Sequence, residues 1–84
     1  MDKYEIRRML ENKQAFVASL SVILREFDQE RSGVESITLK VEQDSWDGYE
    51  EEIQIKLVGG TRIRIPATGN SNIANMRVIG KALQ

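Results

Sequence analysis

The first third of the chain has the hydrophobic periodicity of one long amphipathic helix. Asp2, followed three residues later by Glu5, is typical of a helix N-terminus. Ser32-Gly33 supplies the residue that most easily adopts the left-handed conformation that ends a helix. We therefore predict a helix from Lys3 to Glu30. Its apolar positions recur at helical spacing and are Ile6, Met9, Leu10, Phe16, Val17, Leu20, Ile23, Leu24 and Phe27.

This helix is long for the strands that follow it. At 1.5 Å per residue it would span about 42 Å, whereas a seven-residue strand spans about 23 Å. One end must therefore overhang the sheet, and two arrangements would bury it. In the one we favour, the helix breaks near Asn12-Lys13-Gln14 and folds back. In the other, a second copy of the chain covers Ile6, Met9 and Leu10, which would make the protein a homodimer.

From Ser36 onward the period of the apolar residues changes to two, which predicts strands that are half-buried on one face. Three such segments follow one another, separated by Asp47-Gly48 and by Gly59-Gly60. A polar stretch then precedes a short helix with Asn70 or Ser71 as its N-cap. The apolar positions of these elements are Ile37, Leu39, Val41, Ile53, Ile55, Leu57, Ile63, Ile65, Ile73, Met76, Ile79, Ala82 and Leu83.

The sequence thus predicts one α+β domain over residues 1–84, with the order α-β-β-β-α. A long N-terminal helix is followed by a three-stranded antiparallel meander and a short C-terminal helix. Residues that oppose each other across two strands must point to the same face, so the faces suggest a register. The expected pairs are Ile37 with Leu57, Leu39 with Ile55 and Val41 with Ile53 in the first hairpin, and Leu57 with Ile63 and Ile55 with Ile65 in the second.

Composition excludes several classes of function. The chain has no Cys and no His, which removes disulfides, thiolate nucleophiles, imidazole bases and the usual ligands of zinc, copper and iron. Its apolar runs fall short of the roughly 20 residues that span a bilayer, and the first residues resemble no secretory signal. We therefore expect a non-enzymatic protein without cofactor, metal or membrane contact. Its expected location is the cytoplasm, that of the host cell if a phage encodes it.

The charges are unevenly distributed although the net charge is only −1. Residues 1–52 hold thirteen acids and seven bases, a net charge of −6, whereas residues 53–84 hold five bases and no acid, a net charge of +5. This separation can steer a charged partner. It can equally reflect complementary charges on neighbouring strands.

The first hairpin gathers six acids within residues 42–52, with no base among them. The expected register opposes Glu42 to Glu52 and Asp44 to Glu50, and like charges directly across a strand pair are destabilising. An exposed tryptophan in such a turn would be a typical binding anchor. The alternative is that Trp46 folds back over the sheet and that the acids only keep a sheet edge soluble. The candidate partner-binding residues are Glu42, Asp44, Trp46, Asp47, Tyr49, Glu50 and Glu52.

Calcium binding and carboxylate catalysis are poor explanations of this hairpin. An EF-type loop aligned on Gly48 would place Gln43 at its first position and Gln54 at its twelfth, where carboxylates are needed. Paired carboxylates that cleave glycosides need a surrounding cleft, which a hairpin on so small a domain does not offer.

The second half carries the opposite charge, close to a polar loop that opens the last helix. A helix N-terminus with arginines nearby can hold a phosphate. We favour the alternative, in which the strand arginines face solvent and balance the acidic sheet. The candidate phosphate-binding residues are Arg62, Arg64, Arg77 and Lys81, with Lys56 in the same basic set.

The α-β-β-β-α order is similar to that of the double-stranded-RNA-binding domain, and the apolar residues of the closing segment, Asn70 to Leu83, match the last helix of that family. Its functional residues do not carry over. Where the family has lysines at the start of this helix, the chain has Ser71, Asn72 and Asn75. Its first hairpin is acidic where the family contacts the minor groove, and such a loop would repel RNA. Direct nucleic-acid binding is therefore the less favoured expectation.

The segment from Ser36 to Tyr49, with Asp47-Gly48 at the turn, resembles small acidic phage proteins that inhibit CRISPR nucleases. This resemblance implies that the acidic hairpin imitates nucleic-acid phosphates or base edges. It would then occupy arginines that a nuclease uses to read its DNA. We therefore expect an inhibitor that presents the hairpin to a basic protein surface, with a nucleic-acid-binding module or a structural homodimer as alternatives.

Overall fold

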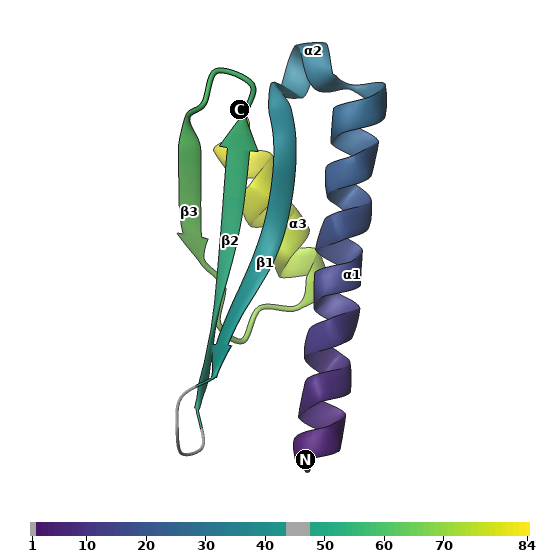
Figure 1. The fold of residues 1–84 in the computed structure, drawn as a ribbon, viewed down its shortest axis with the longest axis vertical. Coiled ribbons are helices and arrows are strands. Elements are labelled where there is room, and N and C mark those ends of the chain that lie inside the picture. The colour runs from purple at the N-terminus through teal and green to yellow at the C-terminus, as the bar shows by residue number, and fades with distance from the viewer. Residues whose placement is uncertain (1, 44–47) are drawn as a thin grey trace.

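Two helices lie against a three-stranded antiparallel sheet in the computed structural model, which describes residues 2–43 and 48–84 (Figure 1). The sheet order is β1-β2-β3, so consecutive strands are neighbours. The predicted α+β class and the α-β-β-β-α order are confirmed, and α2 is an additional single turn. The elements are α1 (Lys3–Phe27), α2 (Gln29–Ser32), β1 (Val34–Gln43), β2 (Tyr49–Leu57), β3 (Arg62–Pro66) and α3 (Asn72–Ala82).

The helix ends follow the local sequence signals. The Asp2 side chain accepts a hydrogen bond of 2.8 Å from the backbone N–H of Glu5, as the N-terminal pattern predicts. Asp28, with φ −145° and ψ 29°, separates α1 from α2. Gly33 then ends α2 with φ 68°, in the left-handed region expected for it. Ser71 is the N-cap of α3, and its hydroxyl accepts a hydrogen bond of 3.1 Å from the N–H of Ala74.

The break that we expected near residues 12–14 is wrong, because α1 continues through them. These polar residues contact the sheet instead of interrupting the helix. Lys13 is buried and its ammonium reaches Glu51 of β2, while Gln14 Nε2 donates a hydrogen bond of 3.3 Å to the carbonyl of Leu39. Polar residues at this point therefore hold α1 to the sheet.

The lengths of helix and sheet agree better than the sequence suggested. The 25 residues of α1 span about 37 Å and the ten residues of β1 span about 33 Å. The strand is longer than the apolar alternation indicates. Ile6, Met9 and Leu10 are half-buried within one chain, so the length mismatch that suggested a dimer through α1 is absent.

The core lies between the sheet and the two long helices. A bulge between Val34 and Ser36 changes the phase of β1, which lets Val34 and Ile37 point to the same side. Ala67, just after β3, closes this core. Its buried apolar members are Val17, Val34, Ile37, Leu39, Ile53, Ile55, Ala67 and Ile79.

Four apolar positions of the predicted helical stripes are exposed rather than packed. Ile23 and Phe27 lie at the end of α1, and Ile73 and Met76 lie on α3; Phe27 is 82% exposed. Each stripe covers a wider arc of its helix than the narrow sheet can bury. The residues of α1 that do pack against the core include Phe16, Leu20 and Leu24.

The predicted registers are wrong by two residues in both hairpins, although every residue keeps its predicted face. A slip of two leaves the alternation of faces unchanged, so the faces alone cannot distinguish the two pairings. In the second hairpin Val58 leaves the sheet and donates a hydrogen bond of 2.9 Å to the carbonyl of Gly33. The observed pairs are Ile37 with Ile55, Leu39 with Ile53, Val41 with Glu51, Ile53 with Ile65 and Ile55 with Ile63.

The left-handed conformation of Gly33 gives a direct test of this end of the fold. Gly33→Ala should lower the free energy of unfolding by about 1–2 kcal/mol, because an L-residue is strained at φ 68° even though the added Cβ meets no atom within 4 Å. Gly59→Ala is the matched control, since its Cβ is equally free and its φ is not positive. Urea denaturation measures both, and an equal effect of the two changes would contradict the assignment.

Candidate functional site

One face of the sheet is not covered by the helices and carries most of the charged strand residues (Figure 1). We call it the open face. Four cross-strand rows make it up: Glu42 with Glu50, Lys40 with Glu52 and Pro66, Thr38 with Gln54 and Arg64, and Ser36 with Lys56 and Arg62.

The end of the open face next to the first hairpin tip is acidic. We define the acidic end as Glu42, Glu50 and Glu52. Glu42 lies directly opposite Glu50, not opposite Glu52 as the sequence suggested, because the true register pairs Glu52 with Lys40. The opposed like charges predicted from the sequence are therefore present, but between a different pair of residues. Such a pair destabilises an isolated hairpin.

Neighbouring cations neutralise part of this charge. Lys40 Nζ lies 3.2 Å from Glu42 Oε1, and Arg64 Nε lies 3.9 Å from Glu52 Oε1. Glu52 also accepts a hydrogen bond of 2.8 Å from Gln54 Nε2. Glu50 is exposed and makes no ion pair with any residue that the structure describes. These exposed pairs are weak, so the acidic end keeps much of its negative potential.

A hollow of about 300 Å³ lies beside the acidic end. It forms where β3 ends at Pro66 while β2 continues to Tyr49, so the flank of β2 is left without a neighbouring strand. Its lining is rich in carboxylates, and its volume is large enough for a guanidinium or ammonium group. The lining residues are Lys40, Glu42, Glu50, Glu51, Glu52, Pro66 and Thr68.

The other residues predicted for partner binding have mixed outcomes. Asp44, Trp46 and Asp47 lie outside the described residues. Tyr49 opens β2 opposite Gln43 and is half-buried. The described part of the predicted site is therefore the three glutamates of the acidic end together with Tyr49.

Glu51 behaves unlike the acidic residues on either side of it, and it is not one of the predicted site residues. It occupies an inward position opposite Val41 and is only 2% exposed. Its carboxylate oxygens lie 3.2 and 3.3 Å from Lys13 Nζ, and Oε2 accepts a third hydrogen bond of 2.9 Å from the N–H of Gly69. The signal that could have found it is the strand alternation itself, which, extended back from Ile53, places Glu51 on the apolar face.

The backbone of Glu51 is also held by the segment that joins β3 to α3. Its N–H donates to Thr68 Oγ1 at 2.9 Å, and its carbonyl accepts from the N–H of Ala67 at 2.9 Å. We call Lys13, Glu51, Ala67, Thr68 and Gly69 the Glu51 cluster. It joins α1, β2 and the β3–α3 connection at one point, and it positions the acidic end relative to the helices.

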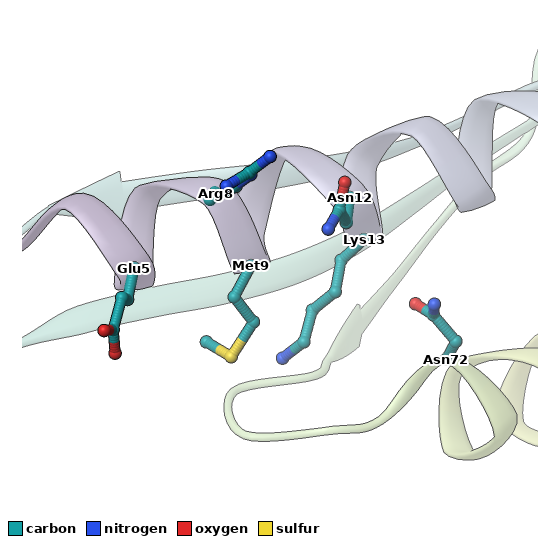
Figure 2. A pocket seen from close by; sticks show the side chains of 6 residues that line it. All are labelled: Glu5, Arg8, Met9, Asn12, Lys13 and Asn72. Carbon is teal, nitrogen blue, oxygen red and sulfur yellow. The ribbon is translucent and has the colours of Figure 1, made fainter. Parts of the chain in front are cut away.

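A second hollow, of about 420 Å³, lies between the N-terminal half of α1 and the start of α3. In Figure 2 the Lys13 side chain points from α1 toward the loop that leads into α3, and Met9 lies beside it. The Lys13 ammonium is already engaged by Glu51. Asn72 Oδ1 and both polar side-chain atoms of Asn75 are buried without a hydrogen-bond partner among the described residues.

The four residues proposed to hold phosphate do not gather in one place. Arg62 and Arg64 lie on the open face, because Ile63 and Ile65 point to the core. Arg77 and Lys81 are exposed on α3, which lies behind the sheet in Figure 1. The structure therefore divides the basic set between two sides of the molecule, with Lys56 joining the two strand arginines.

Comparisons of the chain with models of protein families, with curated proteins and with solved structures find no match. Among residues 2–43 and 48–84, no helix is both long enough and apolar enough to span a membrane. The same residues contain no group of three or more acidic side chains placed to hold a metal ion.

The Glu51 cluster can be tested through the stability of the fold. Lys13→Met should lower the free energy of unfolding by about 3–5 kcal/mol, because it leaves a buried carboxylate without its counter-ion. Adding Glu51→Gln to this variant should recover part of the loss, since the amide keeps an acceptor for the Gly69 N–H without the charge. Urea denaturation of the two single variants and the double variant gives the coupling energy. Additive effects would contradict a direct contact.

Proposed function

We propose that this protein is a non-enzymatic interaction module that binds a basic surface of another protein through the acidic end of its open face. The observation that carries the proposal is the direct opposition of Glu42 and Glu50 beside a carboxylate-lined hollow. Like charges held together cost stability in the free protein, and a cation from a partner would relieve that cost.

The hollow indicates how a partner would be recognised. An arginine that enters it would lie beside the glutamate carboxylates and Thr68, which line the hollow. Guanidinium groups bind carboxylates through paired hydrogen bonds, which makes arginine the better occupant than lysine. Arginine-rich surfaces are common where proteins bind nucleic acids. The proposed partner surface is therefore one that would otherwise hold nucleic-acid phosphates.

In its more specific form, the proposal is that the module inhibits an RNA-guided CRISPR nuclease by occupying its DNA-reading arginines. This form rests on the resemblance of residues 36–49 to small phage inhibitors. It also needs the hairpin to reach into a nucleic-acid channel. The described ends of β1 at Gln43 and of β2 at Tyr49 extend beyond the end of β3, on the side of the molecule where α1 begins (Figure 1), which supports such a reach.

Nucleic-acid or phosphate binding by the basic residues is the second candidate function, favoured by the proximity of Lys56, Arg62 and Arg64 on one face. It has weaker support, since Lys56 and Arg64 already have carboxylate neighbours in Glu35 and Glu52. A gel-shift series in rising salt separates the two functions. A complex with DNA or RNA that weakens steeply with salt would favour the second.

Charge reversal tests the first proposal. The double variant Glu42→Lys with Glu50→Lys should weaken binding of a fluorescent oligoarginine peptide by about tenfold or more at low salt. Fluorescence anisotropy measures the affinity. The same variant should lose inhibition of target-DNA cleavage by a guide-loaded CRISPR nuclease if the more specific proposal is correct.

The control for net charge is Glu11→Lys with Glu30→Lys, which changes the total charge equally on the exposed surface of α1 and α2. It should bind the peptide nearly as the unmodified protein does. Equal weakening by both double variants would show that only net charge matters and would reject the acidic end as the binding surface. Circular dichroism confirms that each variant is folded.

A further inference from the structure

The open face carries two like-charge pairs of opposite sign, one at each end. Glu42 opposes Glu50 at the acidic end, and Lys56 opposes Arg62 at the other. We define the basic end as Lys56, Arg62 and Arg64. Glu50 and Lys56 are six positions apart along β2, a distance of about 20 Å. Each like-charge pair disfavours the isolated sheet, although Lys56 has Glu35 and Glu42 has Lys40 as a partial counter-charge. The acidic end of one copy would relieve the repulsion at the basic end of another.

A second copy of the chain supplies both complements at once. A half-turn about an axis that lies in the face and crosses the strands reverses the strand direction and brings two open faces together. The axis passes between the row of Lys40 and the row of Thr38. This operation lays β2 on β2, so Glu50 of each copy faces Lys56 of the other. The contact is isologous, as expected for a two-fold dimer.

The third strand adds a shape match to the charge match. Arg62 lies at the basic end of β3, and the same half-turn carries it over the place where β3 of the other copy has already ended. That place is the hollow of about 300 Å³ between Pro66, Thr68 and Glu50. An exposed arginine thus meets a carboxylate-lined hollow at both ends of the interface.

We propose that the open face pairs with the open face of a second copy, in antiparallel orientation, with Arg62 of each copy seated in the acidic hollow of the other. The dimer is weak and salt-sensitive, because the face is small, polar and only three strands wide. It differs from a dimer formed through α1. It does not rest on the binding of a basic partner, since it needs only this chain, but it covers the same acidic end.

Analytical ultracentrifugation of the purified protein tests the dimer. Self-association should be seen at about 0.02 M salt and be largely lost at about 0.5 M, where screening is strong. Arg62→Ala should raise the dissociation constant by about tenfold, as expected for loss of a seated cation. Arg77→Ala is the matched control, because Arg77 is an exposed arginine on α3, away from the open face, and it should have no effect.

A charge exchange makes the test specific for orientation. One double variant carries Glu42→Lys and Glu50→Lys, so both of its ends are basic. The other carries Lys56→Glu and Arg62→Glu, so both of its ends are acidic. Neither should self-associate, and an equimolar mixture should form a one-to-one dimer. If the acidic variant does not fold, Lys56→Gln with Arg62→Gln replaces it. Its self-association should be lost, and mixing it with the basic variant should restore the charge contact at only one of the two ends of the interface.

Three results would overturn the proposal. The unmodified protein could be monomeric at low salt and high concentration. Alternatively, it could dimerise equally well with Arg62→Ala and with Arg77→Ala, which would place the interface elsewhere. Finally, each charge-exchanged variant could still associate with itself. None of these results bears on peptide binding by the monomer, so failure of the dimer and failure of the proposed function are distinguishable.

Discussion

The contact between the Lys13 ammonium and the Glu51 carboxylate, both buried, is the constraint on which the rest of the structure depends. It joins the middle of α1 to β2, and Gly69 brings the β3–α3 connection to the same carboxylate. Removing two charges from water is costly, and their attraction returns little more than that cost. Such a pair contributes less to net stability than to the choice of one arrangement over another, because an arrangement that separates the two groups while either stays buried leaves an unpaired charge.

The contact between Lys13 and Glu51 favours one of two registers of β1 and β2. The apolar residues of β1 and β2 permit two pairings that differ by two residues, with Val41 opposite either Ile53 or Glu51. In the first pairing, Glu51 would oppose Gln43, farther toward the hairpin tip. The second brings Glu51 to Lys13 and makes Glu42 oppose Glu50, while Lys40 opposes Glu52. A contact on the buried face therefore decides which charges meet on the open face.

Local signals in the sequence predict most of the fold, and contacts between distant segments account for the parts that they do not predict. Asp2, Gly33 and Ser71 mark helix ends because capping involves only a few neighbouring residues. Strand alternation gives the faces but not the register. The polar residues around Lys13 suggested a helix break, because the residue that Lys13 binds, Glu51, is 38 positions away and no local pattern reveals the contact. The sequence alone shows that the first hairpin is acidic. The opposition of Glu42 to Glu50 and the hollow beside them depend on tertiary structure.

The position of β3 explains why the separation of acidic and basic residues along the sequence becomes a separation along the sheet. β2 runs from acidic to basic residues, and β3 returns beside its basic end, so Arg62 joins Lys56. A longer β3 would continue to the acidic end and fill its flank. Instead the chain leaves the sheet after Pro66, where Ala67 and Thr68 bond to the backbone of Glu51. These hydrogen bonds hold the chain at Glu51 as it turns toward α3, so β3 pairs with β2 only as far as Glu52 and the hollow stays open beside Glu50.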